Sequence, residues 1–578
     1  PDKVTFTCIL KACGSVGSLE IGEVIHTEIS KQGLLRKDLM LGNTLIDMYA
    51  KCGMLGKALE VFKELPVHDV VSWNALIGGY AQHDLGHEAL RCFREMHNEG
   101  IAPTVVTFTL VLKACASVRC LEVGEEIYEK VSKLGLLGKD FMLGTALVDM
   151  YAKCGELEKA RNVFEMLPRR DVVSWNALMA GYAQHDLAEE ALKCFRRMRD
   201  EGILANPLTF ISVLKACGSI GALDMGREIH AEVKKIGLLQ KDLMLGTAVV
   251  DMYAKCDMME KAQEVFEELP VHDVVTWNAL IGGYAQNGLG NEALKCFQQM
   301  EDEGIAPNVA TSISILKACG SVGNLEMGEE MCAKIRKQGL ITKDIMLGTA
   351  LVDMYGKCGA LEKAQDVFEE LPVHDVVAWS ALISGYAKHG HDDEALKCFR
   401  QMQDEGISSD TVTFTCILKV CGIVGSLEIG EEVHALVKKQ GLMVKNIVVG
   451  TALMDMYAKC GMLNKAQEVF EELPVKDVMC WNLLLAGYAQ HGHSDKVIKY
   501  FEKMKEEDDV HPDAVTFSCV LKACGATRSL LMGKTIHSEV RKRGLLATNL
   551  ILGTALMDMY AKCGLLEKAH EVFQELLV

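Results

Sequence analysis

A hydrogen-bonding side chain follows each of the five tryptophans in this sequence. The stretch DVVSWNALIGGYAQ occupies residues 69–82. Near-copies of it begin at Asp171, Asp273, Asp375 and Asp477. The residue after tryptophan is asparagine in four copies, as at Asn74, and serine in one, at Ser380. An amide both donates and accepts hydrogen bonds, whereas the carboxylate that opens each copy only accepts them. Such side chains can recognise the polar edge of a ligand.

Three His-x-Glu triplets could supply part of a zinc site, and they begin at His26, His230 and His537. A zinc deaminase combines such a triplet with Cys-x-x-Cys, which together hold the metal and move a proton. No Cys-x-x-Cys occurs in the chain, and the three histidines occupy equivalent places in a repeat. No phosphate-binding loop or nucleophile motif occurs either. We therefore expect no metal site, no cofactor and no enzymatic activity within these residues.

The composition is that of a folded protein, with 49% hydrophobic and 24% charged residues. No stretch approaches the roughly 18 uncharged apolar residues of a membrane span. Of the 22 cysteines, six recur at one repeat position, where we expect buried, reduced thiols and hence a reducing compartment. These are Cys52, Cys154, Cys256, Cys358, Cys460 and Cys563. Because the chain begins at Pro1 without a targeting segment and stops inside a repeat, we expect a piece of a longer protein or a consensus design.

The tryptophans are 102 residues apart, and this period contains three related units of 35, 36 and 31 residues. In the first complete period the units begin at Val70, Val105 and Phe141. Each unit holds two apolar stretches with helical spacing and a short polar turn, which predicts a helical hairpin. One hairpin cannot bury both apolar faces, so hairpins must stack. The sequence thus predicts an all-α fold, a right-handed superhelical α-solenoid of stacked helix-turn-helix repeats, with first helices lining its concave face.

The three alternating lengths, with the motifs W-N-A-L-I-x-G-Y-A-Q, TFxxxLKAC and GTALVDMYAKCG, resemble the pentatricopeptide-repeat (PPR) family. Within it they resemble the PLS subclass of land-plant organelles, the type found in RNA-editing factors. This implies one continuous array over residues 1–578, of about 17 motifs. The array comprises L (3–38), S (39–69) and P-L-S triplets at 70–171, 172–273, 274–375, 376–477 and 478–578, the last S being truncated. One residue is inserted around Glu507 to Val510. The last motif resembles the internal S motifs, so we expect no E or DYW region in this chain.

In the PPR family each motif faces one nucleotide of single-stranded RNA, which its fifth and last residues read. The protein runs N to C along the RNA from 5′ to 3′. A carboxylate at the last position favours U and G, which offer an imino N–H, whereas an amide suits C or A. In the family, fifth-position asparagine goes with pyrimidines, and threonine or serine with purines. The implied base-reading pairs are Asn43 with Asp69, Asn74 with Thr104, Thr145 with Asp171, Asn176 with Asn206, Thr247 with Asp273, Asn278 with Asn308, Thr349 with Asp375, Ser380 with Asp410, Thr451 with Asp477, Asn482 with Asp513, and Thr554 alone.

From the second motif onward the implied preference is U-Y-n-G-Y-n-G-Y-n-G-G-n-G-U-n-R, where Y is a pyrimidine and R a purine. The L motifs stay unread, because their fifth residues follow no uniform code and Ile211 and Ile313 cannot hydrogen-bond a base edge. Aspartate before a helix is also a good N-cap. Capping alone leaves unexplained why the last P-motif residue varies among Asp, Asn and Thr while the neighbouring Val and Trp hardly change, so base reading is favoured.

Two further sets of residues complete the implied RNA site. The second residue of P and S motifs clamps the bases in the family; these residues are Met40, Val71, Met142, Val173, Met244, Val275, Met346, Val377, Val448 and Met479. Although the net charge is −18, lysines recur at position thirteen of S motifs and position nine of L motifs, near the helix face of the fifth residue. The predicted phosphate-facing lysines are Lys51, Lys153, Lys255, Lys357, Lys459, Lys562, Lys11, Lys113, Lys215, Lys317, Lys419 and Lys522.

The sequence therefore predicts a sequence-specific binder of single-stranded RNA, the targeting array of an organellar C-to-U editing or processing factor. The resemblance implies a monomer in a mitochondrion or plastid. Its implied partners are RNA, a DYW-type deaminase domain in cis or in trans and other editing factors, and no membrane. The alternative is a protein-binding helical-repeat scaffold of the tetratricopeptide type, although that family keeps a uniform repeat of about 34 residues.

Overall fold

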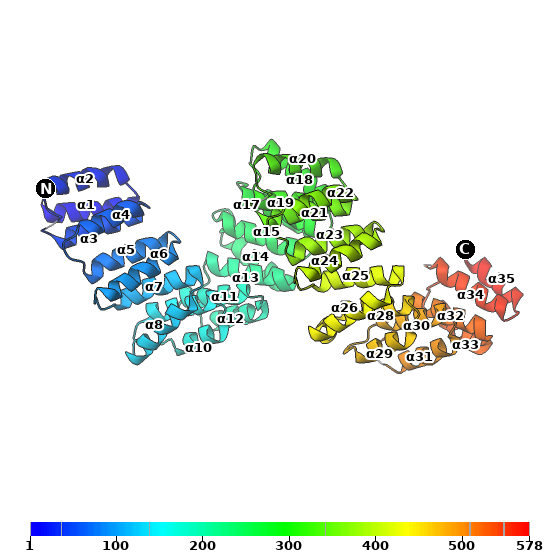
Figure 1. Ribbon diagram of the computed structural model, residues 1–578. Helices are drawn as coiled ribbons and strands as arrows, with labels where there is room; N and C mark the ends of the chain where they lie inside the picture. Colours follow the sequence, from blue (N-terminus) through cyan, green and yellow to red (C-terminus); the bar gives the residue numbers. More distant parts are fainter. Residues whose placement is uncertain are drawn as a thin grey trace. The chain divides into compact units, whose positions relative to one another are not determined.

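The computed structural model describes residues 2–35, 37–137, 139–341, 343–507, 510–546 and 549–576. Within these ranges every regular element is a helix (Figure 1), and none of the helices combines the length and apolar character that a membrane crossing requires. The predicted insertion around Glu507 to Val510 falls in part on residues 508 and 509, outside the described ranges. The last two residues of the truncated S motif, 577 and 578, also lie outside them.

Helices alternate between the first and second member of each hairpin. The first helices are α1 (Lys3–Val16), α3 (Leu39–Lys51), α5 (Val70–Gln82), α7 (Val105–Val118), α9 (Phe141–Lys153), α11 (Val172–Gln184), α13 (Pro207–Ile220), α15 (Leu243–Lys255), α17 (Val274–Gln286), α19 (Val309–Val322), α21 (Ile345–Cys358), α23 (Val376–Lys388), α25 (Thr411–Val424), α28 (Ile447–Lys459), α30 (Val478–Gln490), α32 (Ala514–Thr527) and α34 (Leu550–Lys562).

The second helices are α2 (Leu19–Lys31), α4 (Leu55–Glu64), α6 (Gly86–Asn98), α8 (Leu121–Lys133), α10 (Leu157–Met166), α12 (Ala188–Asp200), α14 (Leu223–Lys235), α16 (Met259–Glu268), α18 (Gly290–Asp302), α20 (Leu325–Lys337), α22 (Leu361–Glu370), α24 (Asp392–Asp404), α26 (Leu427–Lys439), α29 (Leu463–Glu472), α31 (Ser494–Glu506), α33 (Leu530–Lys542) and α35 (Leu566–Leu576). A single helical turn, α27 (Leu442–Lys445), precedes α28.

Polar caps define where the first helices begin. The Asp171 carboxylate accepts the backbone N–H of Ser174, whose hydroxyl returns to the backbone of Asp171, so α11 opens with a reciprocal capping box. The turn after α13 is closed by Gly221, whose φ of 67° lies in the left-handed region that glycine adopts without steric cost. Local sequence thus fixes both ends of these helices.

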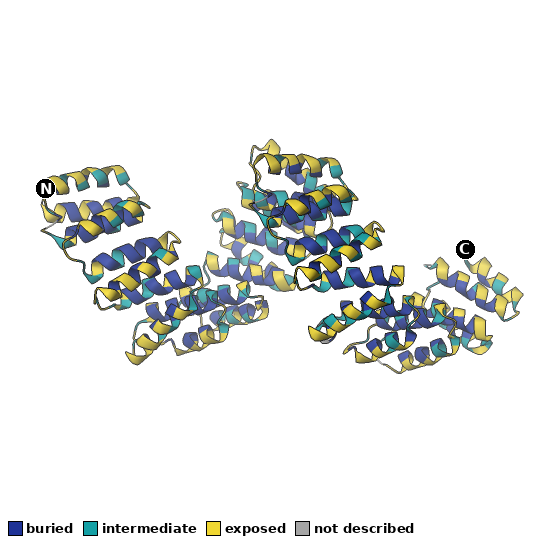
Figure 2. Cartoon of the chain, viewed as in Figure 1, coloured by how far each residue is buried: buried dark blue, intermediate teal, exposed yellow. Residues whose placement is uncertain are grey.

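The repeated tryptophans form the contact between an S motif and the next P motif. All five are 2% exposed or less, and the Trp175 ring packs edge-on against Phe164 of α10 with 4.6 Å between ring centroids. Each of the other four makes an equivalent contact with a second-helix phenylalanine. The predicted inter-repeat core is therefore confirmed, and Figure 2 shows buried faces running along the first helices.

The chain divides into two compact units, Pro1–Asn287 with Cys296–Ala306, and Gly288–Lys295 with Pro307–Val578, so α18 contributes to both. Within each unit a first helix contacts the first helix of the next hairpin and the second helix of its own. A Cβ added to Gly181 of α11 would lie 2.5 Å from the Cβ of Ala152 in α9, so these helices approach too closely for a larger residue. Each unit is an α-solenoid of stacked hairpins, which confirms the predicted fold class. That the whole chain forms one continuous array stays a prediction.

The six recurring cysteines were expected to be buried, and this expectation is wrong. All 22 cysteines are free thiols, but these six are half-buried. They lie where the S-motif first helix ends, as at Cys52, the C-terminal cap of α3, and a helix end is more open to solvent than its middle. Fully buried thiols occur instead within helices, for example at Cys115 and Cys217 in L-motif first helices and at Cys480 in a P-motif first helix.

Candidate nucleic-acid interface

The predicted fifth and last residues meet across repeat junctions. Asn176 of α11 is 4% exposed, and its Nδ2 donates to Oδ1 of Asn206, the N-cap of α13, over 3.0 Å. Three further predicted pairs join in the same way, with donor–acceptor distances of 3.0 to 3.1 Å. These are Asn43 with Asp69, Ser380 with Asp410, and Asn482 with Asp513. The geometry therefore places a polar pair at the N-terminal end of the first helices.

The S-motif threonines are not joined to their partners. The buried hydroxyls of Thr145 and Thr349 have no hydrogen-bond partner among the described residues. The hydroxyls of Thr247, Thr451 and Thr554 donate to carbonyl oxygens of their own helices. Among the described residues, each predicted threonine thus lacks the direct bond to the following cap that Asn43 makes.

The remaining predicted residues occupy equivalent places. Asn74 lies on α5, where its buried Oδ1 has no partner among the described residues, and Thr104 caps α7. Asn278 belongs to the first unit and Asn308, which caps α19, to the second. The L-motif fifth residues share this helix position, and Thr109 and Thr415 donate to carbonyls of their own helices. Thr7, Ile211, Ile313 and Ser518 are the other L-motif fifth residues.

Every last residue of a P or S motif in the predicted pairs is an N-cap, so the expected capping role falls on the same residues as the predicted base reading. In α11 only one oxygen of Asp171, Oδ1, takes part in the cap, which leaves the second carboxylate oxygen for another donor. Burial alone would raise the pKa of Asp513, but hydrogen bonds from Thr516 and Asn482 hold it below its usual value. This carboxylate is therefore ionised at neutral pH and acts only as an acceptor.

The predicted clamping residues are exposed apolar side chains beside these pairs, from 52% exposed at Val448 to 73% at Met244. The L motifs carry the same apolar second residue, although the predicted clamping residues include only those of P and S motifs. Their second residues Val4, Val106, Leu208, Val412 and Val515 are 52% to 68% exposed. The signal was available, because the second residue is apolar in nearly every motif of all three types.

Two grooves of the first unit combine these groups. One, of about 510 Å³, is lined by the polar pair Asn176 and Asn206 and by the apolar second residues Met142, Val173 and Leu208. The other, of about 790 Å³, runs along α1, α3, α5 and α7. Its lining includes Asn43, Asp69, Asn74, Met40, Val71 and Val106. Apolar walls beside a hydrogen-bonding end suit a flat ring that carries polar edge groups.

The predicted phosphate-facing lysines fall into two classes. Each S-motif lysine pairs with the aspartate four residues earlier in its own helix, as Lys255 does with Asp251 at 2.7 Å. The other pairs are Lys51–Asp47, Lys153–Asp149, Lys357–Asp353, Lys459–Asp455 and Lys562–Asp558. The L-motif lysines are exposed, and the described residues offer them no ion-pair partner. The i,i+4 spacing made the S-motif pairs readable from the sequence.

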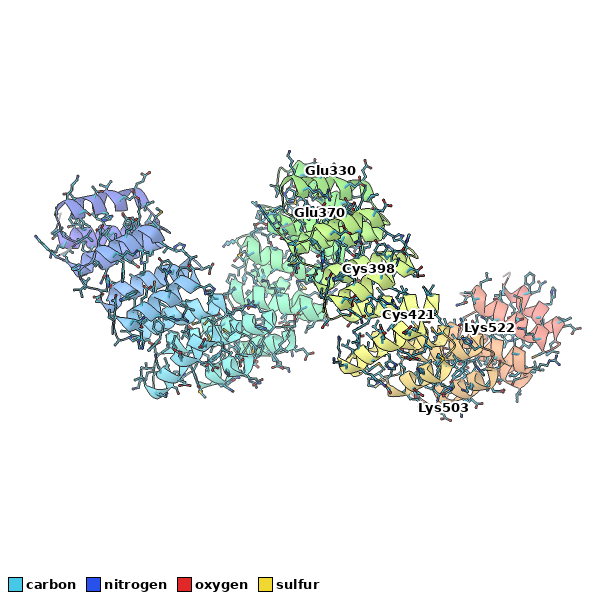
Figure 3. All side chains as sticks on the ribbon, in the orientation of Figure 1. Glu330, Glu370, Cys398, Cys421, Lys503 and Lys522 are labelled. Carbon is cyan, nitrogen blue, oxygen red and sulfur yellow. The ribbon has the colours of Figure 1, made fainter. Side chains whose placement is uncertain are left out.

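Acidic residues gather on the second helices. Figure 3 labels Glu330 on α20 and Glu370 on α22, and it labels Lys522 on the first helix α32. Several glutamates bridge consecutive second helices, as Glu370 does with Arg336 over 2.8 Å. The net charge of −18 is therefore spread unevenly, and the L-motif lysines, which have no ion-pair partner among the described residues, lie on the first helices.

The His-x-Glu histidines have a structural role. His26, His230 and His537 each place Nδ1 within 2.9 to 3.0 Å of the hydroxyl of an S-motif tyrosine, such as Tyr253 opposite His230. Burial lowers the pKa of each of these histidines. Nowhere in the described part of the chain do three or more His, Cys, Asp or Glu side chains form a group that could hold a metal ion.

Comparison with known families identifies the repeats. A model described as "PPR repeat family" matches residues 68–117, 170–219, 272–321, 374–422 and 476–526. A model described as "PPR repeat" matches residues 43–70, 145–172, 247–274, 349–376, 451–478 and 554–578. The chain is 33% identical over 569 residues to pentatricopeptide repeat-containing protein At2g03380, mitochondrial, of Arabidopsis thaliana, covering 98% of this chain and 81% of that one. The chain belongs to the pentatricopeptide repeat family.

Two further Arabidopsis thaliana relatives are similar. At4g18520, chloroplastic, is 35% identical, covering 84% of this chain and 78% of that protein. At3g09040, mitochondrial, is 34% identical over the whole chain, which spans 55% of that protein, about half its length. Among solved structures, pentatricopeptide repeat protein PPR10 from maize has a TM-score of 0.52 at 20% identity, covering 100% of this chain and 89% of PPR10. A PPR10 structure in complex with an 18-nt psaJ RNA element has a TM-score of 0.53 at 21% identity, covering 100% and 84%. At these identities the likeness establishes the fold.

Proposed function

We propose that this chain binds one strand of RNA sequence-specifically, one nucleotide per motif. The observation that carries the proposal is the hydrogen-bonded pair of fifth and last residues between exposed apolar second residues, as at Asn176 and Asn206. The complex of PPR10 with RNA supports the same ligand class. A base would stack between the second residues of adjacent motifs and present its Watson–Crick edge to the polar pair.

The chemistry of each pair sets the preference. An ionised aspartate such as Asp513 accepts but cannot donate, so it selects U or G through their imino N–H. At Asn206, Oδ1 is occupied by the Thr209 cap, so Nδ2 is the group available to a base, which favours the acceptor N3 of C. The proposed string is U-Y-n-G-Y-n-G-Y-n-G-G-n-G-U-n-R, with the twelve lysines serving the phosphates.

We further propose the PLS arrangement, supported by three unit lengths in fixed order, and action as the address-reading module of an editing or processing factor. The module itself binds and does not catalyse, and a DYW-type deaminase, in cis or in trans, together with other editing factors, would supply the chemistry. Relatives named mitochondrial or chloroplastic support an organellar location. We propose that the array acts as a monomer.

The test is a titration with three labelled RNAs at two salt concentrations. One carries the proposed string, the second has every G replaced by A, and the third has its pyrimidines replaced by purines. Base reading predicts that each replacement weakens binding by about tenfold or more, because several mismatched positions act together. Equal, salt-sensitive binding of all three would leave only phosphate contacts.

Absence of binding to any of the RNAs would favour the protein-binding scaffold. In that case substitution of Asn176 or Thr247 would also leave every RNA measurement unchanged.

A further inference from the structure

In several L motifs the third residue of the first helix contacts the fifth residue of the preceding P motif. The hydroxyls of Thr209, Thr413 and Thr516 are fully buried. Thr209 Oγ1 lies 2.7 Å from Oδ1 of Asn176, and Thr516 Oγ1 lies 2.6 Å from Oδ1 of Asn482. In the copy with serine, Thr413 Oγ1 lies 2.5 Å from Oγ of Ser380.

Around Asn482 these bonds fix which end of the amide faces which neighbour. Its Nδ2 lies 3.0 and 3.1 Å from the two oxygens of Asp513, which as an ionised carboxylate can only accept. Thr516 Oγ1 accepts the backbone N–H of Asp513 over 3.1 Å, and its own proton has two acceptors, Oδ1 of Asn482 at 2.6 Å and Oδ1 of Asp513 at 2.9 Å. Because two acceptor oxygens do not approach to 2.6 Å without a proton between them, the hydroxyl donates to Asn482. Both ends of the Asn482 amide are therefore held, and a 180° flip would break both bonds.

Equivalent hydrogen bonds hold both ends of the Asn176 amide. Asn206 accepts from Nδ2 of Asn176 and from the backbone N–H of Thr209. The Thr209 hydroxyl lies 2.7 Å from Oδ1 of Asn176 and 2.9 Å from Oδ1 of Asn206, and it donates to the nearer oxygen. The second N–H and the second lone pair of the Asn176 amide then have a fixed direction, which is what a base edge would meet.

Within the described residues, S-to-P junctions show no equivalent of this bond. The third residues of the P helices, Ser72, Ser174 and Thr276, there hydrogen-bond only the cap of their own helix. The Oδ1 atom of Asn43 is buried without a partner among the described residues. Two P motifs replace this residue by Ala378 and Cys480, whereas all six L motifs keep threonine. A capping role alone would be shared by both motif types, so the L-motif hydroxyl has a second function.

We propose that Thr209, Thr413 and Thr516 are positioning residues, each of which orients the base-reading side chain of the preceding P motif. The inference rests on the proposed RNA recognition. It gives the L motifs a part in specificity even where their own fifth residue, such as Ile211, cannot read a base. P motifs preceding such a threonine discriminate bases more sharply than S motifs do.

The test compares T209V and T107V, with T209S as the conservative variant. Thr107 occupies the same helix position and caps α7 in the same way, but Oδ1 of the preceding Asn74 has no partner among the described residues. Each protein is titrated with four RNAs that differ only in the base facing Asn176, and four that differ only in the base facing Asn74.

We expect the ratio of Kd between the best and the next base at the Asn176 position to fall roughly fivefold in T209V, since one of two amide bonds is lost. T209S should keep the wild-type ratio, and T107V should leave the ratio at Asn74 unchanged. All RNAs are measured on one preparation, so an inactive fraction cancels from each ratio. The same comparison with T516V at Asn482 repeats the test in the second unit.

The outcomes separate the two proposals. A wild-type protein that shows no base preference at Asn176 or Asn482 would refute base reading itself. Unchanged ratios in folded T209V and T516V, or equal losses in T209V and T107V, would overturn the positioning role while leaving base reading intact. Failure of both valine variants to fold would assign the hydroxyl a purely structural role and would also overturn it.

Discussion

At the residue scale, each capping residue has two roles, one in its own helix and one in a predicted base-reading pair. Asp273 caps α17 and is also the last residue of the S motif that contains Thr247, with which it forms a predicted base-reading pair. The hydroxyl of Thr247 points back to the carbonyl of Leu243 over 2.9 Å, so in this state it does not reach the aspartate. In another S motif the fifth residue is Asn43, whose amide donates to Asp69 over 3.1 Å.

The variant T247N should convert the proposed G-reading pair into the pair found at Asn43 and Asp69. We expect RNA with U at that position to become the better ligand, with a change of roughly tenfold in the Kd ratio of U to G. T247S, which keeps the hydroxyl, should retain the G preference. A fluorescence titration with the two RNAs measures both variants, and an unchanged ratio in T247N would contradict the assignment.

A second residue-scale contrast concerns the tryptophan N–H. Trp73 Nε1 donates to Glu99 over 3.2 Å, whereas the buried Nε1 of Trp175 has no acceptor among the described residues. W73F should therefore lower the free energy of unfolding by about 1 kcal/mol more than W175F does, because only W73F removes a hydrogen bond. Urea unfolding midpoints of the two variants would show the order, and equal midpoints would speak against it.

At the element scale, histidine–tyrosine bonds join L-motif second helices to S-motif first helices. His230 on α14 and Tyr253 on α15 are 3.0 Å apart. Burial holds the pKa of His230 below its ordinary value of 6.5; nearby Lys234 acts in the same direction and Glu268 opposes it. Equivalent bonds hold α2 to α3, α26 to α28 and α33 to α34, through His26, His434 and His537.

Because the folded pKa is depressed, the unfolded chain binds more protons than the folded chain just below about pH 6.5, and stability must fall as the pH falls through that window. Replacing the four histidines by tyrosine, as the chain itself does at Tyr128, should flatten this dependence. Thermal unfolding followed by circular dichroism between about pH 7.5 and pH 5 compares the two proteins. Parallel pH curves for both would show that these histidines are not the titrating groups.

At the scale of the whole molecule, binding strength should depend on charges that are not already paired. The L-motif lysines have no ion-pair partner among the described residues, whereas the S-motif lysines have partners within their own helices. Exposed pairs of this kind are weak and salt-sensitive, so an RNA phosphate can compete with the aspartate but gains less.

Substitution of all six L-motif lysines by glutamine should lower the slope of log K against log salt by up to about 4, since each phosphate contact on a single strand contributes about 0.7. The same substitution of the six S-motif lysines should lower it less. Titrations at four salt concentrations give both slopes, with circular dichroism as the folding control. A larger effect from the S-motif set would reverse the assignment.

The sequence predicted contacts between residues that are close together along the chain better than contacts between residues that are far apart. Helix hairpins, caps such as Asp171 and the tryptophan core follow from local spacing, and all were predicted. The pairing of Lys255 with Asp251 was readable from four-residue spacing and was overlooked. The contact of Thr209 with Asn176 joins residues 33 positions apart, and it depends on how far one hairpin slides along the next. Periodicity does not set that register, because side-chain packing at the junction decides it.

The double duty of the capping residues limits how such arrays can diverge. Mutations that exchange Asp, Asn, Ser and Thr before a helix cause little loss of stability, because all four residues cap well. Alanine or valine at the same position lowers the free energy of unfolding by about 1 kcal/mol. The residues that folding tolerates at this position are thus also the ones that differ in hydrogen-bonding character. During evolution the preferred RNA sequence can therefore change one motif at a time while the protein remains folded at every step.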